Sequence, residues 1–276
     1  MKPYITTCLL IFIPFIFGCR ENKTSHNNPA IAVSSSYIEA ALKDICGKDA
    51  NILLIVPPGM CPGHFDISPQ KVKMISDCRL LLLFDFQTSM ADSLNRLKDN
   101  GLNIESLSAP GGLCKPQSYM SVVEQISIIL SELYPEKKDF YTERKTCINQ
   151  RMISLQKQLI TTVTDSHLSG TKILSATHQA DFAKWLGLDV ISTYGSQDTT
   201  TAYEINQILQ KIDTEQISII IANKQQGSQL ESVLSERLNV RFTEFNNFPL
   251  CETGNAPFFD TMVTDNVNKL IEKLND

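Results

Sequence analysis

The chain has 276 residues, of which 42% are hydrophobic and 20% are charged, a composition typical of a globular protein with one or two domains. Its formal net charge at pH 7 is −5, so there is no basic surplus to neutralise phosphates, which argues against a nucleic-acid binder. No block of like charges indicates an interaction tail.

The N-terminal stretch MKPYITTCLLIFIPFIFGC has the layout of a secretory signal, with one lysine followed by an apolar run. The run from Cys8 to Phe17 is shorter than the roughly 20 residues that a membrane span needs. An aliphatic residue at −3 and a glycine at −1 before Cys19 resemble the cleavage box of bacterial lipoproteins. We therefore expect residues 1–18 to be a lipoprotein signal peptide and Cys19 to carry the lipid, with a plain signal peptide cut elsewhere as the alternative. Residues 19–35 are polar and rich in Asn and Ser, which predicts a flexible tether.

The chain contains eight cysteines, and six remain once Cys8 leaves with the signal and Cys19 carries lipid. Outside the cytoplasm such thiols tend to pair or to bind metal, although six are too few for a disulfide-dense scaffold. Some are expected to be buried as small hydrophobic side chains, and Cys147, inside a helical pattern, is the first candidate.

Helices and strands alternate after the tether. A helix is expected over 36–47, and Ser68 and Pro69 mark the start of another, as an N-cap and a first helical residue. The remaining elements of this half are strands at 51–58, 79–86 and 102–107 and a helix at 90–101. Repeated strand–helix units indicate a doubly wound parallel sheet, and we expect an N-terminal α/β lobe over 36–136.

A long helix follows a shorter one at 117–134. Residues 137–165 contain neither Gly nor Pro, and apolar residues recur close to the helical period, at Phe140, Cys147, Ile148, Met152, Leu155, Leu159 and Val163. Such a helix is about 40 Å long at 1.5 Å per residue. We expect the segment 137–166 to be a rigid strut between two lobes.

The alternation resumes in the second half, and 167–276 is expected to form the C-terminal α/β lobe. Its strands are expected at 171–178, 189–195, 217–224 and 240–245, and its helices at 180–188, 201–212, 227–238 and 258–274. The predicted fold class is therefore α/β, with two doubly wound parallel-sheet lobes, one long helix and a ligand cleft between the lobes.

Candidate ligand-binding residues follow the strands, because open α/β sheets bind ligands beyond the carboxyl ends of their strands. This rule selects Met60, Cys61, His64, Asp66, Gly111, Gly112, Cys114, His178, Asn246, Asn247 and Cys251. Cys61 and His64 are spaced as two ligands of one ion would be, but one such pair is a weak signal. Each histidine alone could equally brace a loop or cap a helix. Their joint position, at strand ends in different lobes, favours a shared cleft.

Two sequence stretches resemble a known family. In PGHFDISPQKVKMISDCRLLLLF and THQADFAKWLGLDV, His64 and His178 take the places of metal ligands. From Ile52 to the C-terminus the chain resembles the substrate-binding proteins of bacterial ABC transporters for zinc and manganese. The resemblance implies two α/β lobes joined by a rigid helix, with a metal ion held between them and passed to a membrane permease.

The chain departs from that family at two ligand positions. Gly111 stands where the family has its second histidine, with Cys114 nearby as a substitute, and Asn246 or Asn247 stands where the family has an aspartate. The His- and acid-rich loop of many zinc members is absent.

These observations predict a four-ligand metal site of Cys61, His64, Cys114 and His178. Thiolates favour zinc and copper(I) over manganese, so zinc is the expected cargo, with manganese and copper(I) as the other candidates. Four ligands with no open position describe a carrier and not an enzyme. The expected partners are the metal ion, an ABC permease and the membrane that holds the lipid anchor, and the protein is expected to be an exported monomer on the cell envelope.

Two alternatives remain. The same fold could bind a non-metal ligand or a metal complex, with Cys61 and Cys114 joined as a disulfide. An exported enzyme is the third reading, for which the sequence offers no nucleophile elbow, phosphate loop or HExxH motif.

Overall fold

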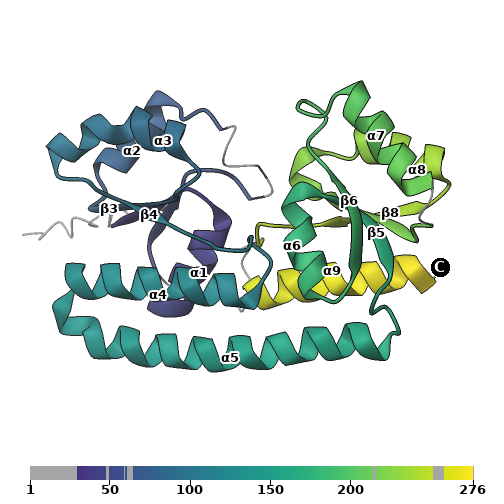
Figure 1. The fold of residues 1–276 in the computed structure, drawn as a ribbon. Coiled ribbons are helices and arrows are strands. Elements are labelled where there is room, and N and C mark those ends of the chain that lie inside the picture. Colours follow the sequence, from purple (N-terminus) through teal and green to yellow (C-terminus); the bar gives the residue numbers. More distant parts are fainter. Residues whose placement is uncertain are drawn as a thin grey trace, which may run out of the picture.

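The computed structural model describes residues 30–47, 50–58, 60, 65–213, 216–250 and 258–275. In this part of the chain, two four-stranded parallel sheets lie side by side, each with helices on both faces (Figure 1). This arrangement confirms the predicted fold class of two doubly wound lobes joined by a long helix.

The first lobe contains strands in the order β2-β1-β3-β4. Its strands are β1 (Ile31–Val33), β2 (Ile52–Leu54), β3 (Leu80–Phe84) and β4 (Asn103–Leu107). Its helices are α1 (Ser36–Cys46), α2 (Pro69–Ser76) and α3 (Thr88–Leu94), which continues as the 3₁₀ helix η2 (Asn95–Asn100). The start of α2 is as predicted, because Ser68 Oγ accepts a hydrogen bond from the Lys71 backbone nitrogen at 3.3 Å and Pro69 occupies the first turn.

Strand β1 corrects the predicted tether, which was expected to extend to residue 35. Residues 31–33 are a fully buried strand that pairs with both β2 and β3. Three residues of strand followed by serines are too short a pattern to distinguish from a linker by sequence. The missed strand also changes the place of β2. It is the second strand along the chain and lies at the edge of the sheet, beside β1.

The second lobe repeats the topology of the first, with strands in the order β6-β5-β7-β8. Its strands are β5 (Lys172–Ala176), β6 (Asp189–Tyr194), β7 (Ile219–Asn223) and β8 (Arg241–Phe245). Its helices are α6 (Thr177–Trp185), α7 (Ala202–Asp213), α8 (Gln229–Leu238) and α9 (Phe258–Asn275), with the 3₁₀ turn η4 (Lys224–Gln226). In both lobes the strand order reverses between the two central strands, which is where open sheets bind ligands.

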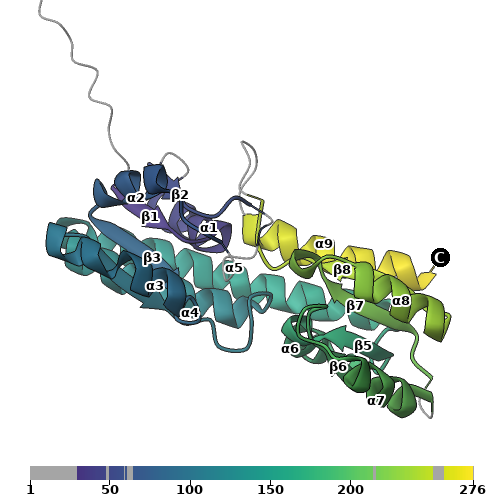
Figure 2. The same cartoon turned by 90° about the horizontal axis from the view of Figure 1, so that it is seen from above.

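Helix α5 (Lys138–Asp165) runs beneath both lobes, after α4 (Pro116–Leu133) and the 3₁₀ turn η3 (Pro135–Lys137) (Figures 1 and 2). Its 28 residues make it about 42 Å long at 1.5 Å per residue. Its buried residues are Tyr141, Ile148, Met152, Leu155, Leu159 and Val163. Phe140 and Cys147, which were expected on this face, are exposed, because the buried stripe begins one residue later than the apolar pattern suggests.

The hydrophobic core has one shared part and two separate parts. The lower faces of both sheets, together with α1, α4, α5, α6 and α9, form one continuous cluster of buried side chains. The upper face of the first sheet packs on α2 and α3, and that of the second sheet packs on α7 and α8, as two further clusters. The two lobes therefore share one core cluster on the lower side of the sheets, which we call the shared core, and each has its own separate cluster on the upper side. Within the described residues, no helix combines the length and apolar character needed to cross a membrane.

Candidate ligand-binding pocket between the lobes

A pocket of about 440 Å³ lies between the two lobes, at the carboxyl ends of their strands. The first lobe contributes Asp85, Phe86, Ser108, Ala109, Gly112 and Leu113, and the second contributes His178, Asn223, Gln225, Asn247 and Phe248. We call this the interlobe pocket. Its walls are apolar and amide groups, and Asp85 and His178 are its described residues with a carboxylate or an imidazole.

His178 lies in the first turn of α6 and is exposed to the interlobe pocket. Its neighbours fix the start of this helix. Thr177 Oγ1 donates a hydrogen bond to the Tyr194 carbonyl at 2.9 Å, and the buried Gln179 donates to Asn247 Oδ1 at 3.0 Å. The imidazole is therefore presented from a rigid helix start in the second lobe.

Cys114 lies behind the wall of the interlobe pocket, at the junction of the two lobes. Its side chain is buried, and its Sγ lies 3.1 Å from Asn247 Oδ1 and 3.4 Å from the Asn246 carbonyl. It also accepts a hydrogen bond from Asn266 Nδ2 at 3.8 Å. Asn247 thus contacts Cys114 and lines the pocket together with His178, whereas Cys114 is not among the lining residues.

The surroundings of Cys114 hold it as a neutral thiol. Burial raises its pKa far above its ordinary value of 9.0, and the atoms within hydrogen-bonding distance are those of uncharged amides and carbonyls. The thiol is free in the structure. The described chain therefore brings His178 to the pocket lining and leaves Cys114 buried in contact with another lining residue, Asn247.

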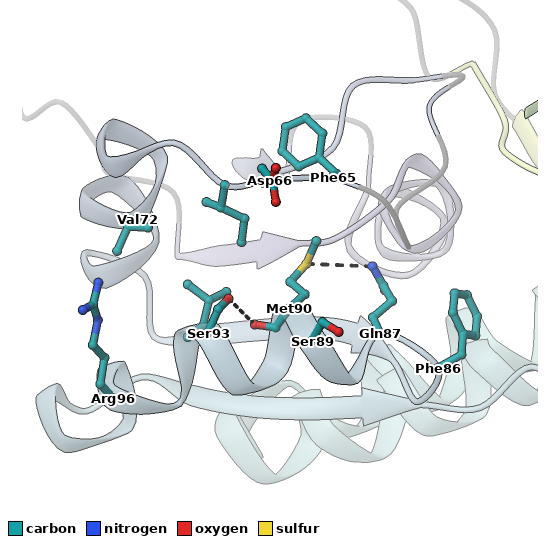
Figure 3. Close-up of a pocket in the computed structure, with 11 residues that line it drawn as sticks. Phe65, Asp66, Val72, Phe86, Gln87, Ser89, Met90, Ser93 and Arg96 are labelled. Atoms are coloured by element: carbon teal, nitrogen blue, oxygen red, sulfur yellow. Dashed lines mark hydrogen bonds between the residues drawn. The ribbon is translucent and has the colours of Figure 1, made fainter. Parts of the chain in front are cut away.

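The predicted ligands Cys61 and His64 lie outside the described residues. The segment that follows them returns at Phe65, and residues 65–67 line a second pocket of about 600 Å³ over α2 and α3 (Figure 3). Phe86 lines both this pocket and the interlobe pocket. Its ring stacks on that of Phe84, with centroids 5.1 Å apart. The two pockets thus share one lining residue, Phe86.

The two departures from the family pattern have local explanations. Gly111 has a φ of +82°, which strains any residue with a Cβ, and an added Cβ would collide with the Lys115 side chain. Histidine at position 111 would therefore be strained, and the Lys115 side chain would have to move. At the other position, Asn247 lines the pocket, whereas Asn246 is held by Gln225, whose Nε2 donates to its Oδ1 at 2.6 Å.

Four polar lining residues are not among the sequence candidates, namely Asp85, Ser108, Asn223 and Gln225. Asp85 directly follows β3, Asn223 ends β7 and Gln225 lies in the turn after it. Asp85 and Asn223 fall inside the expected strands 79–86 and 217–224, which extend past the observed ends of β3 and β7, whereas Ser108 and Gln225 directly follow expected strands. No group of three or more His, Cys, Asp or Glu side chains within the described residues is arranged to hold a metal ion.

Solved structures of the same architecture place the chain in the class of two-lobed α/β folds joined by a long helix. A crystal structure of ZnuA has a TM-score of 0.73 and 14% identity, and it covers 88% of this chain and 98% of its own. The periplasmic zinc-binding protein TroA from Treponema pallidum has a TM-score of 0.74 and 15% identity, with coverages of 90% and 99%. The laminin-binding protein Lmb of Streptococcus agalactiae, described as having adhesin and metal-transporting activity, has a TM-score of 0.73 and 16% identity, with coverages of 88% and 98%.

The family is identified by its own model. Residues 31–273 match the zinc-uptake complex component A, periplasmic (ZnuA), and the chain belongs to this family. Among curated proteins none matches the chain.

Proposed function

We propose that this protein is an exported binding lipoprotein that captures a transition-metal ion between its lobes and delivers it to an ABC permease. Zinc is the first candidate for the cargo. Family membership supports the proposal, and the observation that carries it is an imidazole, His178, on a pocket walled by both lobes. Residues 1–18 as the signal peptide and Cys19 as the lipid anchor belong to the same proposal.

The proposed ligands are His178, His64, Cys61 and Cys114. Imidazole nitrogen and thiolate sulfur suit zinc. His178 already faces the interlobe pocket. Cys114 would have to lose its proton and its contact with Asn247 before it could bind an ion, since it is a buried neutral thiol. We therefore rank His178 above Cys114 as a ligand.

A second candidate function keeps the fold and changes the cargo to a metal complex or another small organic ligand. The lining of the interlobe pocket favours it, because Phe86, Leu113 and Phe248 line the pocket beside amide groups. Organic ligands commonly bind in pockets of this size with apolar walls and a few polar groups. The Cys61–Cys114 disulfide that was considered with this alternative gains no support, since Cys114 is a free thiol.

Transport would follow from binding. The lobes share a continuous core along α5, which restricts their relative motion. An ion that contacts both lobes binds the closed arrangement better than the open one, and this difference in affinity shifts the population toward closure. The permease would then recognise the closed form. No step of this scheme requires catalysis.

The test is metal content. The mature protein is expressed with its own export signal, purified under reducing conditions and analysed for bound elements, alongside His64→Ala, His178→Ala and the control His167→Ala. His167 is exposed and is not among the pocket residues. We expect about one zinc per chain in the wild type and the control, and a large loss in the other two variants. Unchanged metal content in both would refute the proposal.

Intact-mass measurement under native conditions separates the two cargo classes. A bare ion adds only its own mass, whereas a complex adds that of its organic part as well. A bound organic mass in a metal-free wild-type sample would favour the second candidate.

A further inference from the structure

Asp85 occupies the ligand-binding edge of the first sheet. It directly follows β3, and it lines the interlobe pocket. Strand β3 pairs with β1 at the centre of the sheet, and the connections from these two strands leave in opposite directions, to β2 and to β4. This is the switch point at which doubly wound sheets bind their ligands.

The turn that carries Asp85 is fixed by hydrogen bonds on both sides. The Asp85 backbone nitrogen donates to the Leu107 carbonyl at 3.0 Å, which ties the turn to the end of β4. Gln87 Oε1 accepts hydrogen bonds from the Phe84 backbone nitrogen at 2.8 Å and from Ser34 Oγ at 2.6 Å. Gln87 is itself buried, with 2% of its surface exposed. The Asp85 carboxylate is thus presented from a preorganised backbone.

No described side chain pairs with the Asp85 carboxylate, which leaves it available to bind a ligand. Within the described residues, neither Asp85 nor His178 forms a side-chain hydrogen bond or an ion pair. The other polar groups of the pocket are uncharged, namely Ser108, Asn223, Gln225 and Asn247. Among the described residues, a carboxylate and an imidazole without a side-chain partner, one from each lobe, therefore line the same pocket.

We infer that Asp85 is a cargo-contacting residue, supplying a carboxylate oxygen to the metal ion from the first lobe while His178 supplies a nitrogen from the second. The inference rests on the proposed function and adds a residue to it. Carboxylate oxygen and imidazole nitrogen are both ordinary zinc ligands. Asp85 would supply the anionic oxygen that Asn246 and Asn247 cannot provide. Because the two groups belong to different lobes, their joint contact also favours the closed state.

The experiment measures zinc affinity by competition with a chromogenic chelator. It compares the wild-type mature protein with Asp85→Asn, Asp85→Ser, Asp85→Glu, His178→Ala and the matched control Asp92→Asn. Asp92 is exposed on α3 and lines neither the interlobe pocket nor the one beside it. Thermal unfolding in EDTA checks that each variant folds, which we expect because Asp85 is exposed.

We expect Asp85→Asn and Asp85→Ser to weaken zinc binding at least tenfold, Asp85→Glu to keep part of the affinity and Asp92→Asn to match the wild type. Loss of a group that only supports a metal ligand already costs about tenfold to a hundredfold in affinity. A loss below tenfold in both Asp85→Asn and Asp85→Ser, while His178→Ala abolishes binding, would overturn the role of Asp85 and leave the proposed function standing. A wild type that binds no zinc would overturn both.

Discussion

At the scale of single residues, Cys114 links the loop before α4 to three amide side chains of the second lobe. Its Sγ contacts Asn247 and Asn266, and it lies 3.7 Å from Gln179 Oε1. Its burial and raised pKa keep it from ionising, and thiolates are the reactive form of cysteine. It is thus a structural thiol in the metal-free protein.

Alkylation of the native protein tests this view of Cys114. Under metal-free reducing conditions with a maleimide at pH 7, we expect rapid labelling of Cys147, which is exposed on α5, and none of Cys114. Peptide mass mapping identifies the labelled sites, and unfolding in urea should make both cysteines react. Labelling of Cys114 at the rate of Cys147 would contradict its placement.

The site was only partly predictable from sequence. His178 could be found because a histidine at a strand end is a rare and readable signal, and the structure places it on the interlobe pocket. Asp85 was missed because Phe86 extends the aliphatic run of β3, so that the strand seemed to pass through it. The chain turns at Asp85 because Gln87 folds back onto Phe84, a contact that no pattern of hydrophobicity encodes.

At the scale of elements, α5 carries a charged link between the lobes. Arg151 bonds to the carboxylate of Asp44 on α1, and its Nε lies 3.2 Å from Asp260 Oδ2 on α9. Tyr119 of α4 also donates a hydrogen bond to Asp44 Oδ2 at 2.7 Å. One arginine in the strut therefore joins a helix of the first lobe to the last helix of the second.

The Asp260 carboxyl should make stability depend on pH. Burial raises its pKa from the ordinary value of 3.8 to about 6, against the opposing effect of Arg151 and with a further rise from Asp44. The folded state therefore holds this proton more tightly than the unfolded state, so stability falls as pH rises from about 4 to about 6. The contribution is at most about 3 kcal/mol.

Urea unfolding of wild type and Asp260→Asn between pH 4 and 7 isolates this effect, since other carboxyls titrate equally in both. We expect the stability of the variant relative to the wild type to increase over that range and then level off. Asp265→Asn, an exposed position on the same helix, serves as the control and should track the wild type. A constant difference between Asp260→Asn and the wild type would show that Asp260 does not titrate in this window.

At the scale of the whole molecule, the fold could be predicted well because its strands are continuous aliphatic runs such as residues 80–83 and 219–221, which are buried on both faces. The absence of Gly and Pro from 137–165 predicted α5. Strand β1 was not predicted, because its three residues become a strand only by pairing with β2 and β3, which lie up to about fifty residues away in the sequence. The shared core likewise depends on tertiary contacts that a single sequence does not reveal.

The shared core predicts that both lobes unfold together. The one tryptophan, Trp185, lies in the second lobe and packs against the common core, so its fluorescence reports that lobe. Far-UV circular dichroism reports the helices of both lobes. We expect the two signals to give the same midpoint in urea, as for a single cooperative unit. Two separated transitions would show that α5 joins lobes that are independently stable.

The central claim is that a metal ion binds between the lobes at the end of the parallel strands. Crystals of the zinc-loaded protein, measured just above and just below the zinc absorption edge, locate the ion directly. We predict an anomalous peak in the interlobe pocket, about 2.0–2.1 Å from a ring nitrogen of His178. Zinc found only at other surfaces, with no peak in this pocket, would contradict the account.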